Sequence, residues 1–256
     1  MRTRGQIKEI ARYQFRQRYG MSVGAALLFM LLCGGQNFGV NFNYTFGPNS
    51  RWDLYLERIP FAGAVLSWII GTIVALAAVL WLVYILVGLP LEVGHAHFSR
   101  CIYNNWITSV GDMFRRGFGD YGRHLGGLIW RDLFIFLWSL LFVIPGIVKR
   151  YAYFAAPYLL AEFPAVRATD AIKLSMRMTY GYKADLFVLD LSFIGWNLLS
   201  ALTLGLLGIL YVNPYYYTSK AGMYEELKNN ALLTGAVRYE ELAGYPAPPP
   251  GYTPAQ

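Results

Sequence analysis

The sequence predicts an all-α, polytopic helical membrane protein with about six transmembrane helices. They are expected to form three hairpins, each preceded by a cytoplasmic amphipathic helix that lies at the membrane interface. Charged residues make up only 14% of the chain, against about 25% in soluble domains. The 29 residues of 61–89 carry no charge, and about 20 apolar residues suffice to cross the hydrocarbon core. This run disfavours the alternative, a soluble protein with a very large core.

Six apolar segments are candidate membrane spans. They are residues 21–39, 61–89, 126–145, 146–162, 184–203 and 205–222. Residues 1–243 therefore form one multi-pass membrane domain. The tail 244–256 contains five prolines in thirteen residues, a composition that predicts a disordered cytoplasmic extension. A docking motif for a partner is the alternative for this tail.

The fourth segment decides the topology, because it is short and contains Lys149 and Arg150. Pro145 and Gly146 before it form a turn or kink signal. If the chain turns there, the two basic residues lie near the outer interface and the segment returns to the inside. If it does not turn, the segment is a surface or re-entrant piece and every later segment changes side.

The distribution of basic residues favours six spans with both termini cytoplasmic. That arrangement places 17 of the 22 Lys and Arg residues on the inside, as the positive-inside rule expects. A five-span arrangement places the basic cluster of 162–184 outside. Six basic residues precede the first apolar segment, which indicates a segment held on the cytoplasmic side of a membrane, next to anionic lipid headgroups. No motif supports a nucleic-acid partner.

A three-fold internal repeat is the main organising pattern. Each copy is an amphipathic basic stretch, a Tyr-Gly pair and two apolar segments, with a proline near the inner end of the second segment. Tyrosine is favoured at the headgroup level, and glycine allows the chain to bend there. Chance pairing of a common residue is the alternative. The interfacial elbows are Tyr19-Gly20, Tyr121-Gly122 and Tyr180-Gly181, and the prolines are Pro90, Pro157 and Pro214.

Ionisable residues inside the spans are the candidate functional groups, because charge within the bilayer is costly. Arg131 and Asp190 lie at similar depths in the third and fifth spans and are predicted to form an ion pair. A structural role for this pair is favoured over a proton or substrate relay. "LEVGHAHFSR" contains Glu92 and two histidines two residues apart, a spacing unlike that of helical zinc ligands. No catalytic, cofactor or metal site is predicted.

The stretches "LFVIPGIVKRYAYFAAPYLLAE", "AIKLSMRM", "DLSFIGW" and "VNPY" resemble the DUF975 family of bacterial integral membrane proteins. The resemblance is strongest over residues 110–228, and the proline-rich tail falls outside it. It implies a multi-pass protein of the cytoplasmic membrane without an established activity. No catalytic residue can be transferred from it.

Three functional hypotheses follow. The favoured one is a non-enzymatic membrane protein with a packing, scaffolding or regulatory role, in contact with lipids and with another membrane protein or a second copy of itself. The alternative is a small transporter or channel with a polar pathway near spans three to six, since repeats and proline-broken spans are common in transporters. A membrane-embedded enzyme would require Glu92, His95 and His124 to meet within ligand distance.

Overall fold

The computed structural model describes residues 2–33 and 62–242, which form helices and no strand. The expected all-helical class is confirmed for this part of the chain. The proline-rich tail, residues 34–39 of the first predicted span and residue 61 of the second lie outside the described residues.

In chain order the helices are α1 (Arg4–Gln17), α2 (Tyr19–Cys33), α4 (Ala62–Val83), η1 (a π-helical turn, Tyr84–Gly88), α5 (Leu89–Tyr103), α6 (Val110–Gly119), α7 (Tyr121–Leu141), α8 (Val143–Ala152), α9 (Ala156–Glu162), α10 (Ala168–Met178), α11 (Lys183–Leu191), α12 (Ile194–Leu202), η2 (a π-helical turn, Gly208–Val212), α13 (Asn213–Leu233) and η3 (a 3₁₀ helix, Tyr239–Leu242).

Three helical stretches in the described residues are long and apolar enough to cross a membrane: Trp68–Tyr103, Tyr121–Leu141 and Lys183–Leu202. They cover the second, third and fifth predicted spans. The fourth predicted span is divided into α8 and α9 by the turn at residues 153–155. The six-span hairpin arrangement therefore stays a prediction.

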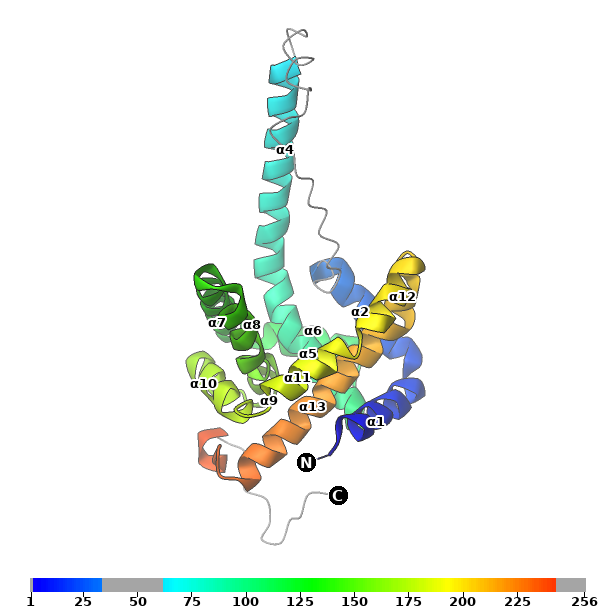
Figure 1. Ribbon diagram of the computed structural model, residues 1–256, viewed down its shortest axis with the longest axis vertical. Helices are drawn as coiled ribbons and strands as arrows, with labels where there is room; N and C mark the ends of the chain where they lie inside the picture. Colours follow the sequence, from blue (N-terminus) through cyan, green and yellow to red (C-terminus); the bar gives the residue numbers. More distant parts are fainter. Residues whose placement is uncertain (1, 34–61, 243–256) are drawn as a thin grey trace.

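Exposed apolar side chains gather on parts of the molecule that project from its body. α4 extends alone along the long axis, and the hairpin of α7 and α8 and the end of α12 point to the same side (Figure 1). Trp68 is 78% exposed and Leu204, just after α12, is 98% exposed. Such surface is unfavourable in water and suits lipid tails, so the fold separates an apolar projecting part from a polar base.

The turn between α7 and α8 lies at Phe142, which is in an extended conformation, and not at Pro145-Gly146 as predicted. Pro145 stands in the first turn of α8, where a missing N–H costs no helical hydrogen bond. Gly146 is buried against Ser139 of α7, and a β-carbon there would overlap that side chain. The Pro-Gly pair thus lets the two helices approach closely after the turn.

At all three predicted elbows an amphipathic helix ends and an apolar helix begins. The breaks fall at Arg18, at Asp120 and at residues 179–182, so Tyr19 and Tyr121 are the first residues of α2 and α7. Of the three elbow glycines, only Gly181 has a positive φ, +84°, which glycine adopts without strain. Gly20 and Gly122 are helical residues next to the break, and the bend there does not depend on them.

The amphipathic helices α1, α6 and α10 pack their apolar faces into the protein. Ile7, Ala11 and Phe15 form the buried stripe of α1, which lies against α13. α6 packs on α5, where a β-carbon at Gly117 would lie 2.7 Å from the carbonyl oxygen of Pro90. These faces are covered by neighbouring helices, so the polar sides of the three helices face outward.

Pro90 and Pro214 each stand two residues after a π-helical turn. Proline cannot donate to the carbonyl four residues earlier. In the π-helical turn before it, the backbone hydrogen bonds span five residues and not four, so the bonding pattern changes before the proline is reached. For Pro90 that carbonyl belongs to Leu86, and the hydroxyl of Tyr121 donates to it at 2.9 Å. An elbow tyrosine of the second repeat thus supports the proline of the first. Pro157 occupies the first turn of α9.

The crossing of α5 and α6 gives a first prediction. A β-carbon at Gly94 would overlap the carbonyl oxygen of Met113, and backbone cannot move away without separating the helices. Gly94→Ala is therefore expected to destabilise the protein by about 2 kcal/mol or more, measured as a lowered thermal unfolding midpoint in detergent.

The matched control is Gly126→Ala in α7, because nothing lies within 4 Å of a β-carbon at that position. It should leave the midpoint unchanged or raise it, since alanine favours the helix. Equal midpoints for the two variants would contradict the close crossing.

Candidate functional site

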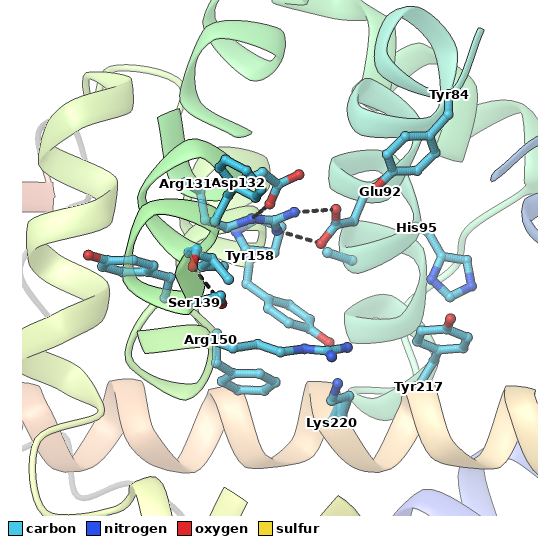
Figure 2. A pocket seen from close by; sticks show the side chains of 16 residues that line it. Tyr84, Glu92, His95, Arg131, Asp132, Ser139, Arg150, Tyr158, Tyr217 and Lys220 are labelled. Carbon is cyan, nitrogen blue, oxygen red and sulfur yellow. Dashed lines mark hydrogen bonds and ion pairs between the residues drawn. The ribbon is translucent and has the colours of Figure 1, made fainter. Parts of the chain in front are cut away.

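A charged cavity of about 600 Å³ lies between α5, α7, α8, α9 and α13 (Figure 2). Its polar lining combines five charged side chains with His95 and with tyrosines, which include Tyr158 and Tyr217. The charged residues are Glu92, Arg131, Asp132, Arg150 and Lys220. A cavity of this size falls within the range of small-molecule sites, so we treat it as the candidate functional site.

Arg131 of α7 bonds Glu92 of α5 and so connects the two helices that form one wall of the cavity. Its guanidinium donates two hydrogen bonds to Glu92, at 2.6 and 2.8 Å, and one from Nε to Asp132 at 2.8 Å. The fork-shaped contact with Glu92 is the strong bidentate form of this interaction. Figure 2 shows this group, here called the Arg131 triad, on one side of the cavity.

The predicted pair of Arg131 and Asp190 is corrected by these contacts. Asp190 accepts hydrogen bonds from the hydroxyls of Tyr151 and Tyr216, at 3.0 and 2.9 Å, and lies 4.0 Å from Nζ of Lys220. It lines a second cavity of about 180 Å³. Similar depth in the sequence indicated that the two charges could meet, but depth does not tell which way a helix faces.

Arg150 and Lys220 are the cations of the cavity that the Arg131 triad does not use. Arg150 lines both cavities, is exposed, and makes no hydrogen bond or ion pair among the described residues. Lys220 lies over the ring of Tyr216, 4.6 Å from its centroid, in addition to the long contact with Asp190. Figure 2 shows both side chains on the side of the cavity opposite the triad.

The three histidines are dispersed. His95 packs edge-on against Tyr217 at 4.4 Å, and His97 lies 3.6 Å from Sγ of Cys101. His124 donates from Nδ1 to the carbonyl oxygen of Gly117 at 2.7 Å, since a carbonyl can only accept. Within residues 2–33 and 62–242, no group of three or more His, Cys, Asp or Glu side chains is placed to hold a metal ion.

A second charged assembly, the base network, lies buried between α5, α9 and α13. Arg100 donates to Glu162 at 2.7 Å and to Glu225, while Lys228 reaches the same two carboxylates at 2.8 and 2.7 Å. Tyr224 also donates to Glu162, at 2.6 Å. Two cations and two carboxylates thus neutralise each other, which leaves no charge for a ligand.

The base network and the pairing of Glu92 with Arg131 were not predicted from the sequence. The available signal was the presence of charges in otherwise apolar stretches, such as Glu162 at the end of "APYLLAE" and the i,i+3 spacing of Glu225 and Lys228. Pairing across three helices depends on their packing, which that signal does not contain.

The second half of the chain supplies α7 to α13 and most of the charges just described. It matches the family model DUF975, a protein of unknown function, over residues 123–231. The expected resemblance is confirmed over this region. No curated protein and no solved structure matches the chain. Both charged assemblies connect the DUF975 region to α5, through Glu92 and through Arg100.

The Arg131 triad gives a second prediction. Arg131→Gln leaves two carboxylates close together without their cation and should cost about 3 kcal/mol of unfolding free energy. The double variant with Glu92→Gln should cost clearly less than the sum of the single changes, because the two residues share the interaction. Unfolding in mixed micelles measures each value.

Arg131→Gln combined with Asp190→Asn provides the comparison for this cycle. Their effects are expected to add, because the two residues share no partner. Strong coupling of Arg131 with Asp190, or none with Glu92, would contradict the observed geometry.

The base network gives a prediction on pH. Burial alone would raise the pKa of Glu225, but Lys228 and Arg100 outweigh it and hold this pKa below its ordinary value of 4.5. The stabilisation from Glu225 is therefore complete above about pH 5 and is lost as the pH falls through the lowered folded-state pKa. The unfolding midpoint of the wild type should fall more steeply below pH 4 than that of Glu225→Gln.

Glu240→Gln is the control, because Glu240 is exposed and outside the base network. Its pH profile should follow the wild type. A Glu225→Gln profile parallel to the wild type would show that the network does not carry this dependence.

Proposed function

We propose that the chain is a multi-pass integral protein of the bacterial cytoplasmic membrane with a non-enzymatic packing, scaffolding or regulatory role. The observation that carries this proposal is the separation of surfaces: α4 and the ends of two hairpins expose apolar side chains, while the base network neutralises its charges inside the protein. A rigid base that supports lipid-facing projections suits a protein that acts through packing within the bilayer. Its expected partners are membrane lipids with anionic headgroups and another membrane protein or a second copy of the chain.

Both termini lie on the cytoplasmic side in this proposal, and the chain crosses the bilayer six times. The basic amphipathic helices α1, α6 and α10 then lie along the cytoplasmic surface, where their exposed Lys and Arg residues meet anionic headgroups. The ends of the two hairpins, near Phe142 and Leu204, reach the outer side. The exposure of these two residues, 67% and 98%, supports this orientation.

A small transporter or channel is the second candidate function, and the two cavities favour it. A bundle that only packs would have no reason to leave Arg150 beside two cavities without a hydrogen bond or ion pair among the described residues, since unpaired charge within the bilayer is costly. Arg150 lines both cavities, so a polar solute could contact it from either one.

Cysteine labelling tests the proposed topology in the full-length chain. In a background without Cys33 and Cys101, Leu204→Cys should react with a membrane-impermeant maleimide added to intact cells. Tyr180→Cys, at the third elbow, should react only after the membrane is permeabilised. Both positions are exposed in the structure, so side-chain burial does not limit the reaction.

The location itself is checked by extraction at alkaline pH, which should leave the chain in the membrane fraction. Labelling of Tyr180→Cys in intact cells would reverse the orientation of the fifth span and refute the six-span topology.

A further inference from the structure

We propose that the charged cavity binds a phosphodiester group, with Arg150 and Lys220 as its two cationic ligands. Such a group is supplied by the headgroup of a glycerophospholipid or by a soluble phosphodiester. The lipid source rests on the proposed membrane location, whereas binding of the group itself does not. Three features of the cavity support this proposal: the donors that the two cations leave available, the charge of the lining and the opening of the cavity.

Arg150 has an entire guanidinium available, because it makes no hydrogen bond or ion pair among the described residues. Lys220 also keeps donors for a ligand. Its nearest carboxylate, Asp190, is 4.0 Å away, and both oxygens of that carboxylate already accept hydrogen bonds from tyrosines. The two cations come from α8 and α13, and each can donate to one of the two non-bridging oxygens of a phosphodiester.

The charge of the lining matches a singly charged anion. Three cations, Arg131, Arg150 and Lys220, face two carboxylates, Glu92 and Asp132, so the lining of this cavity carries a net charge of +1. Asp190, which lies 4.0 Å from Lys220, lines the neighbouring cavity. The Arg131 triad consumes the carboxylates, because Arg131 bonds both of them. A phosphodiester carries one negative charge and would neutralise the remainder.

The shape of the cavity gives a headgroup a lateral route. Phe136 of α7 lines the cavity and is 61% exposed, so the cavity opens along the apolar outer surface of the α7 and α8 hairpin. Tyr153 and Phe154, in the turn between α8 and α9, also line it. A headgroup could therefore enter from this side while its acyl chains stay against the exposed apolar residues of α7.

Binding is tested on the purified full-length protein in a non-ionic detergent. Short-chain phosphatidylglycerol, soluble glycerophosphoglycerol, a short-chain diacylglycerol and a fatty acid of similar length are titrated separately, and the thermal unfolding midpoint is recorded. Phosphatidylglycerol should raise the midpoint with saturation, and the diacylglycerol should not. Arg150→Gln and Lys220→Gln should each weaken the apparent affinity about tenfold, the expected loss from one charge-assisted hydrogen bond.

The matched controls are Arg115→Gln and Lys173→Gln, whose side chains are 84% and 70% exposed and lie outside the cavity. Both should bind as the wild type does, and Arg150→Lys should retain part of the affinity. Because Arg150 makes no hydrogen bond or ion pair among the described residues, Arg150→Gln should unfold without ligand close to the wild-type temperature, which separates binding from folding.

The outcomes distinguish the sources of the phosphodiester. A shift with glycerophosphoglycerol as well as with the lipid indicates that the free group suffices, and a shift with the lipid alone assigns the headgroup. Equal shifts with the diacylglycerol or the fatty acid, or unchanged affinity in Arg150→Gln and Lys220→Gln, would overturn the proposal. None of these results depends on the labelling of Tyr180 and Leu204, so topology and binding can fail independently.

Discussion

The base network is the interaction on which the arrangement of α5, α9 and α13 depends. Arg100, Glu162, Glu225 and Lys228 have side chains between 4% and 12% exposed, and each buried charge costs several kcal/mol of desolvation unless it is paired. Each carboxylate here meets both cations, so any rotation or translation of one helix would break more than one pair. The network therefore specifies the mutual position of the three helices more strongly than apolar packing alone would.

The projecting helices are connected to this base by two similar features, each a π-helical turn followed by a proline. Pro90 and Pro214 begin α5 and α13 just after π-helical turns, and the proline frees a backbone carbonyl that needs another donor. Tyr121, the first residue of α7, supplies a donor at Leu86, which connects α7 to the π-helical turn η1. The first and second predicted repeat units are thus connected by one hydrogen bond, from a recurring tyrosine to the carbonyl that a recurring proline leaves free.

Local features were predictable from the sequence because they depend on neighbouring residues. The breaks before Tyr19 and Tyr121 and the one around Gly181 follow from the change of a basic amphipathic pattern to an apolar one. The turn at Phe142 was predicted three residues too late, because proline was taken as the bend although it is favourable within the first turn of a helix. The partners of Arg131 and Asp190 required the rotation of each helix about its axis, and sequence spacing alone does not define that rotation across helices.

The two charged assemblies show opposite solutions to the cost of placing ions in an apolar environment. In the base network, cations and carboxylates are equal in number and enclosed, so exchange with an external ion would break several short contacts. In the cavity, the Arg131 triad satisfies the carboxylates while Arg150 and Lys220 remain beside open space. Cations retained there need either water or an anion to compensate their charge. Because the cavity opens beside the exposed Phe136, an anion that arrives from the lipid side meets these cations without disturbing the network that holds the helices together.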